Sequence, residues 1–273
     1  MAAPEQVAKD LAQPYGLAFD TDETLFVSEL TAGRVSRIRP DGRPEEFAAT
    51  GGRPMGIAFD DSGDLFVAES GRHHLLLISP DKEVEVYASQ CHGRRLYSPQ
   101  GLYFEPTGHA LFTDAGKEAG SGSVYRADLD GEVEEVIGGL AHPSGMVLTE
   151  DAGGLYLAED GANRILFVEL DDDGKAGEQQ VLITFDDGDG VADLLVDGRG
   201  NLLASRPGAG LSTIDPDGAM VDTMPLPGPA AAGMVFGGLE YDELFVAEAS
   251  TAAVYRLQLE QPGQRPFAGP RSV

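Results

Sequence analysis

The segment PYGLAFDTDETLFVSEL, residues 14–30, sets the pattern of the chain, because its features recur five more times. Each copy has a Pro-x-Gly or similar start, a short apolar run, a polar turn and a second apolar run. The other copies are PMGIAFDDSGDLFVAES from Pro54, PQGLYFEPTGHALFTDA from Pro99, PSGMVLTEDAGGLYLAED from Pro143, VADLLVDGRGNLLASRP from Val191 and AAGMVFGGLEYDELFVAEA from Ala231. Successive copies start 40 to 48 residues apart, which is the length of a four-stranded propeller blade.

Each copy predicts four strands. The two apolar runs, such as Leu17–Phe19 and Leu25–Val27, are short and bounded by turn residues, as buried strands are. A third run follows, for example Val35–Arg39, and then Asp41-Gly42, a pair that supplies the positive φ angles of a tight hairpin. A more polar fourth strand, such as Glu45–Ala48, suits the exposed rim of a blade. We therefore expect one all-β domain over residues 1–273, a six-bladed β-propeller with four antiparallel strands per blade.

Two segments compete to complete the sixth blade. Glu5–Leu11 precedes the first Pro-x-Gly as outer strands precede the other copies, so residues 1–13 would pair with the C-terminal repeat. Arg265–Gly269 could occupy the same place. The pattern favours the N-terminal segment and leaves the choice open.

The chain is strongly acidic, with 46 Asp and Glu residues against 19 Lys and Arg and a formal net charge of −27. Nucleic acids and anionic membranes would repel such a surface, because phosphate binding needs basic residues. No apolar run approaches the roughly 20 residues that span a bilayer, and residues 1–13 lack the apolar core of a signal peptide. A single cysteine, Cys91, fits a reducing compartment. We expect a cytoplasmic monomer with no nucleic-acid or membrane partner.

The acidity itself has two explanations. Only 4 of the 19 basic residues are Lys, and the acidic excess extends along the whole chain. Adaptation to high internal salt is one explanation, since salt screens the self-repulsion of an acidic shell. A low-lysine composition without such an adaptation explains the counts equally well.

Blade topology predicts where a site would lie. Strands alternate in direction, so the start of the first strand and the end of the second share one face, and the first strand lines the central channel. The middle residues of the Pro-x-Gly positions would therefore surround the channel mouth: Tyr15, Met55, Gln100, Ser144, Ala192 and Ala232. The ends of the second strands would add Glu29, Glu69, Asp114, Glu159, Ser205 and Glu248.

Five of those six strand-end residues are carboxylates, and they have two interpretations. Crowded in a concave site, they would repel one another, which raises pKa values or requires a cation. Alternatively, each carboxylate accepts backbone N–H groups and caps a turn beside its strand. The first interpretation makes them binding residues, and the second makes them structural.

Two loops are long enough to cover the mouth: residues 91–97 (CHGRRLY) and residues 116–122 (GKEAGSG). The second loop lacks the sequence of a phosphate-binding loop. A histidine near the mouth could also activate Ser144, if a third group oriented it. Ordinary turn histidines are the alternative, and Cys91 has no metal-ligand spacing. The candidate lid residues are His92, Arg94, Arg95 and His142.

Two stretches resemble the SMP-30/gluconolactonase/LRE-like family. They are residues 142–205, HPSGMVLTEDAGGLYLAEDGANRILFVELDDDGKAGEQQVLITFDDGDGVADLLVDGRGNLLAS, and residues 98–116, SPQGLYFEPTGHALFTDAG. The resemblance implies a six-bladed propeller with calcium or zinc in the channel mouth and with lactonase or related esterase activity. In that family a Glu at the start of blade one, an Asn in blade four and an Asp in blade five hold the metal, with a further Asn in blade three.

Transferred residue by residue, the resemblance places these ligand positions at Tyr15, Gln100, Ser144 and Ala192, none of which is anionic. Asp193, one position after Ala192, is the candidate metal ligand, because it keeps a carboxylate of the kind that Ca²⁺ requires in numbers. We therefore expect any Ca²⁺ or other divalent cation to be weakly held and displaced toward the strand-end carboxylates.

Three functions remain open. The chain could be a lactonase- or esterase-like hydrolase of a small molecule at the channel mouth, where a metal would polarise the carbonyl. It could instead be a non-catalytic propeller that binds a ligand or partner, as NHL-type repeats do. A third alternative resembles strictosidine-synthase-like enzymes, in which a channel carboxylate holds a cationic substrate. The hydrolase interpretation comes first because blades three to five resemble enzymes more than generic repeats.

Overall fold

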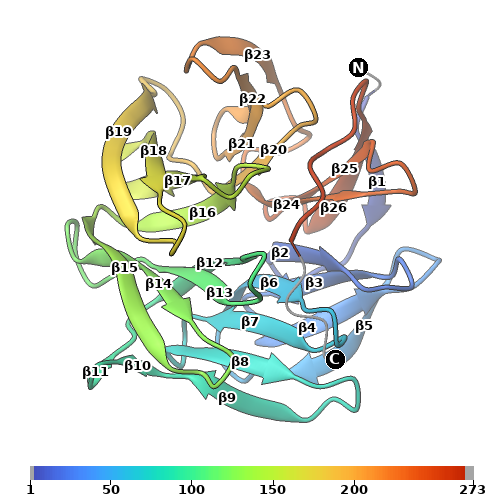
Figure 1. Ribbon diagram of the computed structural model, residues 1–273. Coiled ribbons are helices and arrows are strands. Elements are labelled where there is room, and N and C mark those ends of the chain that lie inside the picture. The colour runs from blue at the N-terminus through green and yellow to red at the C-terminus, as the bar shows by residue number, and fades with distance from the viewer. Residues whose placement is uncertain (1–2, 268–273) are drawn as a thin grey trace.

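The computed structural model describes residues 3–267, which form six four-stranded antiparallel sheets around a central channel (Figure 1). This confirms the predicted six-bladed β-propeller. The strands of blades one to three are β2 (Pro14–Phe19), β3 (Leu25–Glu29), β4 (Arg34–Ile38) and β5 (Pro44–Ala49); β6 (Pro54–Phe59), β7 (Leu65–Glu69), β8 (His74–Ile78) and β9 (Val84–Ala88); β12 (Pro99–Phe104), β13 (Ala110–Asp114), β14 (Gly122–Ala127) and β15 (Val133–Leu140). Those of blades four to six are β16 (Pro143–Leu148), β17 (Gly154–Glu159), β18 (Arg164–Leu170) and β19 (Ala176–Thr184); β20 (Asp193–Val196), β21 (Leu202–Arg206), β22 (Gly210–Ile214) and β23 (Met220–Met224); β24 (Ala231–Gly237), β25 (Glu243–Glu248), β26 (Ala253–Gln258) and β1 (Glu5–Ala8).

The N-terminal strand β1 completes the sixth blade. It pairs antiparallel with β26, where Glu5 lies opposite Arg256 and forms an ion pair with it at 2.6 Å. Of the competing segment, residues 265–267 lie elsewhere, and residues 268 and 269 are outside the described residues. The helical content of residues 3–267 is one 3₁₀ turn, η1 (Asp160–Ala162), and no helix there is long and apolar enough to cross a bilayer.

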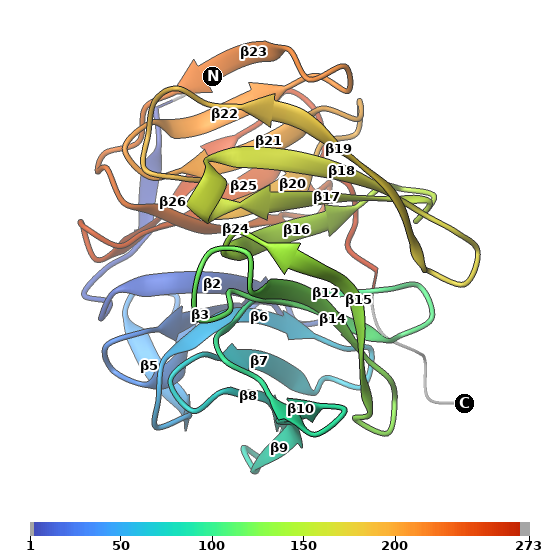
Figure 2. The same cartoon turned by 90° about the vertical axis from the view of Figure 1, so that its left-hand side faces the viewer.

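The second strands are the most deeply buried elements. Every residue of β3, β7, β13, β17 and β21 is buried. Neighbouring blades stack face to face (Figure 2), so these strands are covered on both sides, which explains their continuous apolar runs. Aromatic pairs join the blades: Phe26 meets the edge of Phe59 at 4.9 Å, and Phe66 meets Phe104 at 5.1 Å.

The glycine of each Pro-x-Gly start is required by the close approach of adjacent first strands. A Cβ atom at Gly16 would lie 2.3 Å from the carbonyl oxygen of Met55, and one at Gly101 would lie 2.3 Å from that of Ser144. A Cβ atom at Gly56, Gly145 or Gly233 would lie within 2.6 Å of a backbone atom of the next first strand. In blade five Asp193 occupies the glycine position, so a side chain enters the channel where the other blades present none.

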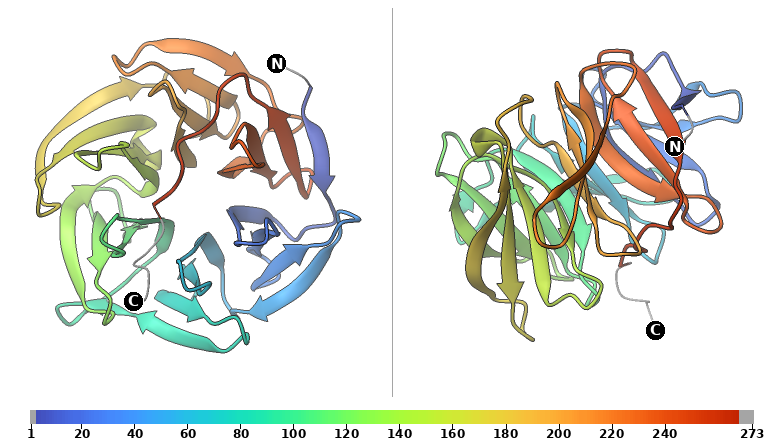
Figure 3. Two further views of the ribbon diagram at one scale, coloured as in Figure 1. Left: turned by 45° about the vertical axis from the view of Figure 1, so that its right-hand side comes forward. Right: turned by 90° about the horizontal axis from the view of Figure 1, so that it is seen from above.

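Residues 259–267, which we call the C-terminal segment, leave β26 and cross one end of the channel (Figure 3). Gln264 fixes this path. Its backbone N–H donates to the Val196 carbonyl at 2.8 Å, and its side-chain amide donates to the Leu148 carbonyl at 3.1 Å. The segment therefore ties blade six to blades five and four at the end where the first strands finish.

The net charge of −27 leads to a prediction about salt. If the acidity is a high-salt adaptation, the melting temperature should rise markedly between low salt and about 1 M salt, because the ions screen the repulsion among surface carboxylates. Scanning calorimetry at neutral pH over that range measures the effect. A flat melting temperature would leave the low-lysine composition as the explanation.

Candidate functional site

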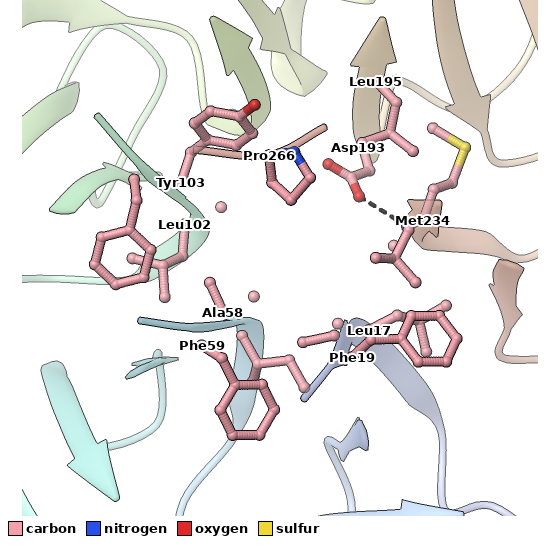
Figure 4. A pocket seen from close by; sticks show the side chains of 18 of the residues that line it. Leu17, Phe19, Ala58, Phe59, Leu102, Tyr103, Asp193, Leu195, Met234 and Pro266 are labelled. Atoms are coloured by element: carbon pink, nitrogen blue, oxygen red, sulfur yellow. Dashed lines mark hydrogen bonds between the residues drawn. The ribbon is translucent and has the colours of Figure 1, made fainter. Parts of the chain in front are cut away.

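A cavity of about 350 Å³ occupies the channel (Figure 4). This volume lies within the range of about 300–1,000 Å³ that is usual for small-molecule sites. The first strand of every blade contributes to the wall, and most of the side chains are apolar. Taking one from each blade in order, they include Leu17, Phe59, Leu102, Met146, Leu195 and Met234.

The cavity opens on the face where the first strands end. Its lining there includes the loops after β2 and β6, together with Pro266 and Phe267 of the C-terminal segment. At the other end its lining includes Tyr15 and Ala192, two of the six residues predicted at the channel mouth. The other four do not line the cavity: Met55, Gln100, Ser144 and Ala232. Of these four, Met55, Ser144 and Ala232 are buried.

Asp193 is the carboxylate deep inside the cavity, and its side chain extends from β20 toward the middle of the ring of apolar side chains (Figure 4). Its Oδ2 accepts the backbone N–H of Met234 at 2.8 Å, and its Oδ1 accepts that of Leu194 at 2.9 Å. Burial raises the pKa of Asp193 to about 7, and the two hydrogen bonds only partly oppose this effect. Near neutral pH both of its protonation states are therefore populated.

Tyr15 lines the same cavity, at the end where the first strands begin. Burial raises the pKa of its hydroxyl, and the negative charges of Asp193 and Asp160 raise it further. The hydroxyl therefore keeps its proton at neutral pH and is available as a hydrogen-bond donor. Asp160 belongs to η1, and burial raises the pKa of its carboxyl as well.

Ser144 and His142 do not form a nucleophile–base pair. Ser144 is buried, and its hydroxyl donates to the Val191 carbonyl at 2.5 Å. His142 contacts the Ala115 carbonyl through Nδ1 at 3.0 Å, so it holds the loop that follows β13. The hypothesis of a histidine-activated serine therefore has no geometric support.

The strand-end carboxylates bind backbone groups and do not line the cavity. Each accepts an N–H from the segment that leads into its own blade. The donors are Ala12 for Glu29, Arg53 for Glu69, Tyr97 and Ser98 for Asp114, Ala141 for Glu159 and Ala230 for Glu248. Burial alone would raise the pKa of Glu29, but hydrogen bonds, the largest from Arg34, outweigh it and hold that pKa below its ordinary value. This geometry corresponds to the capping interpretation.

In blade five the residue at the end of the second strand is not a carboxylate, and the prediction that Ser205 occupies this position is wrong. Asp193 pairs with Ser205, so Arg206 and not Ser205 stands where the other blades carry a carboxylate. Arg206 is buried, donates to the carboxylate of Asp187 at 2.5 Å and stacks on the ring of Phe185 at 3.7 Å. The loop before blade five is thus held by a buried cation.

The predicted lid residues His92, Arg94 and Arg95 lie away from the channel. They belong to the hairpin of β10 (Gln90–Cys91) and β11 (Arg94–Arg95) at the outer edge of blades two and three (Figure 1). Arg94 pairs with Glu135 of β15 at 3.2 Å, and Cys91 is buried in an apolar cluster. This position does not support a lid over the cavity.

The residues at the inherited metal positions do not fit a divalent cation, since Ca²⁺ takes six to eight oxygen ligands. The Tyr15 hydroxyl keeps its proton, and the Gln100 side-chain amide donates a hydrogen bond to Ser98. The Ser144 hydroxyl donates to the Val191 carbonyl, and the side chain of Ala192 has no atom that could bind a metal. Asp193 and Asp160 are the carboxylates whose charges act on Tyr15, and two carboxylates fall short of such a ligand set. Among residues 3–267, no group of three or more His, Cys, Asp or Glu side chains is arranged to hold a metal ion.

Comparison with known sequences gives one family. Residues 14–250 match the model of the SMP-30/Gluconolactonase/LRE-like region. A gluconolactonase of Zymomonas mobilis is 33% identical over 146 residues, which cover 46% of this chain and 41% of the relative. The match thus spans less than half the length of that relative.

Comparison with solved structures agrees. A gluconolactonase from Xanthomonas campestris superposes with a TM-score of 0.83 at 25% identity, covering 94% of this chain and 89% of that one. Regucalcin from Agrobacterium tumefaciens, a calcium-binding protein, superposes with a TM-score of 0.85 at 19% identity, covering 99% and 98%. At that identity the second likeness supports the fold alone.

Proposed function

The chain belongs to the SMP-30/Gluconolactonase/LRE-like family, and from this membership we propose that it is a lactonase-type hydrolase of a small molecule bound in the central channel. The observation that carries the proposal is Asp193. It is a carboxylate inside a cavity of ligand size, and burial brings its pKa to about 7. Perturbed carboxyl groups in such cavities are candidate acid–base catalysts. The similarity to gluconolactonases supports the reaction class.

Asp193 would act as the general base. Ionised, it accepts a proton from a water molecule whose oxygen attacks the lactone carbonyl carbon. The tetrahedral intermediate then collapses, the ring C–O bond breaks, and the leaving alkoxide takes the proton back from Asp193. The product is a hydroxy acid, and the carboxyl group of Asp193 is ionised again.

Tyr15 would stabilise the charge that develops on the carbonyl oxygen. Its raised pKa keeps the hydroxyl protonated beside Asp193, so it can donate a hydrogen bond to the oxyanion. The product acquires a negative charge close to Asp193, and like-charge repulsion would promote its release.

The proposed step uses no metal, because the residues at the inherited ligand positions do not fit one. The expected displacement of a cation toward the strand-end carboxylates also loses its support, since those groups already accept backbone N–H donors. Asp193 is better placed for proton transfer than for membership of a calcium ligand set.

Chelation tests this proposal. We expect purified protein to hydrolyse a lactone in a pH-stat assay and to keep its rate after EDTA treatment, because no step depends on a divalent ion. Calorimetric titration of the chelated protein with Ca²⁺ and Zn²⁺ should show no submicromolar site. Loss of activity on chelation, with recovery in Ca²⁺ and submicromolar binding that Ser144→Ala and Gln100→Ala abolish but Glu69→Ala and Asp114→Ala retain, would establish the inherited metal site instead.

One observation favours a second candidate function. Asp20 and Asp60 lie at the open end of the cavity and Asp193 lies inside, so the channel could hold a cationic ligand without catalysis. Binding of an alkyl ammonium ion that weakens as pH falls below 7, in a protein that hydrolyses no lactone, would support this alternative. Lactone hydrolysis that depends on Asp193 would contradict it.

A further inference from the structure

The chemistry of the cavity wall restricts what it can bind. Between Asp193 and the opening, the wall presents hydrocarbon from every blade, such as Leu102, Met146 and Leu195. A polyhydroxylated lactone would bring several hydroxyl groups into the cavity, and those that face this hydrocarbon would lose water without gaining a partner. An alkyl substituent would instead gain from burial along the same wall.

Charge at the opening adds a second restriction. Asp20 and Asp60 line the cavity in the loops after β2 and β6. Each uses its Oδ1 to accept two backbone N–H groups of its own loop, so both carboxylates are held at the opening. Together with the net charge of −27, they disfavour an anionic ligand.

The C-terminal segment supplies the outer wall. Pro266 and Phe267 line the cavity, and the Phe267 ring meets the edge of the Tyr103 ring with centroids 6.4 Å apart. Gln264, bonded to blades five and four, fixes the segment in this place. A ligand that extends from Asp193 toward the opening therefore meets Phe267 at a definite depth.

We infer that the channel selects a lactone that has a hydrocarbon substituent and no negative charge, and that enters from the face crossed by the C-terminal segment. The carbonyl group lies at Asp193, the substituent packs along the apolar wall, and Phe267 limits the length of that substituent. The catalytic part of this inference rests on the proposed hydrolase function, whereas the binding part does not. It assigns the C-terminal segment a role in specificity.

The test measures binding and hydrolysis separately. Calorimetry gives the Kd of δ-lactams, which resist hydrolysis, with alkyl substituents of increasing length, and a pH-stat assay gives kcat/KM for the matching δ-lactones and for glucono-δ-lactone. We expect affinity to improve about fourfold per methylene until the substituent reaches Phe267, and then to stop improving. Glucono-δ-lactone should be the poorest substrate of the set.

Two variants and one control test which residues determine the affinity for lactams. Ala58→Leu adds bulk to the cavity wall and should weaken lactam binding at least tenfold. Phe267→Ala should leave the affinity for short lactams unchanged and let longer ones gain affinity. Leu239→Ala is the control, because Leu239 is 79% exposed and lies outside the cavity lining. Unchanged melting temperatures show that the variants are folded.

The outcomes separate the two proposals. Lactam binding with this length dependence, in a protein that hydrolyses no lactone, supports the binding inference and overturns the hydrolase. Hydrolysis that is indifferent to chain length and to Ala58→Leu, or that favours glucono-δ-lactone, overturns the inference and leaves the hydrolase standing.

Discussion

Replacing Asp193 with Asn should reduce kcat/KM for lactone hydrolysis about 100- to 10,000-fold, the range that a positioned general base contributes. Asn has nearly the same shape and can still accept the Met234 N–H, but it cannot take a proton from water. The measurement is the initial rate in a pH-stat assay at pH 8. If Asp193→Asn retained most of the wild-type rate, the proposed base would be excluded.

Asp217→Asn is the matched control for this substitution. Asp217 lies in the exposed turn between β22 and β23 of the same blade, and the change removes the same charge. The residue that follows is Gly218, and Asn-Gly is as good a hairpin turn as Asp-Gly. We expect this variant to keep wild-type activity, which would separate the effect of the Asp193 carboxylate from that of net charge.

The pH profile tests the same assignment independently. The base must be ionised, so kcat/KM should rise with pH through an apparent pKa of about 7 and level off above it. The raised pKa of Tyr15 predicts that its hydroxyl causes no decline in the neutral range. In Asp193→Asn the residual rate should lose the inflection, and an inflection that persisted would belong to another group.

The fold could be predicted because the same pattern of strands and turns occurs six times in the sequence. The same four-strand pattern recurs in every blade, with the N-terminal strand completing blade six, so a deviation in one copy does not change the interpretation of the others. Blade five shows the limit of this approach. Its start, Val191-Ala192-Asp193, lacks the glycine of the repeat, and Arg206 occupies the strand-end position for which the sequence predicts Ser205. The match of LLASR in β21 to LFVSE in β3 gives the same placement of Arg206.

The site was harder to predict because residue type does not give direction. A carboxylate at the end of a second strand can face a channel or cap a loop, and the residue type at that position of the repeat is the same in both cases. Glu29 and Glu248 cap loops, since the N–H groups of Ala12 and Ala230 lie within reach. The sequence predicts Asp193 for a different reason, as a substitute metal ligand.

No sequence pattern predicts the residues that form the outer wall of the cavity. Pro266 and Phe267 lie beyond the last repeat, and no motif marks them. Their place follows from the path of the chain, which closes blade six with β1 and so frees the C-terminal segment to cross the channel. Because the N-terminal strand completes blade six, the C-terminal segment is available to form the outer wall of the cavity.

Asp193→Asn should also make the protein more stable above neutral pH. A pKa raised from 3.8 to about 7 in the folded state corresponds to a cost of up to about 4 kcal/mol once the group is ionised. The sign follows from proton binding: the folded state binds this proton more tightly, so the stabilising contribution is complete below pH 3.8 and is lost as pH rises to about 7. The Asn side chain does not titrate, so the variant does not lose this stability as the pH rises.

Urea denaturation at pH 4.5 and pH 8 measures the difference between the two proteins. The other carboxylates titrate alike in both, so their contributions cancel. We expect the stability advantage of Asp193→Asn to be small at pH 4.5 and to reach about 2–4 kcal/mol at pH 8, less whatever the Asn amide loses by facing the Leu194 N–H. A variant less stable than wild type at pH 8 would make Asp193 a structural acceptor. Lower activity together with higher stability in Asp193→Asn would show that the carboxylate serves chemistry at a cost in stability, since the other five blades have glycine at this position.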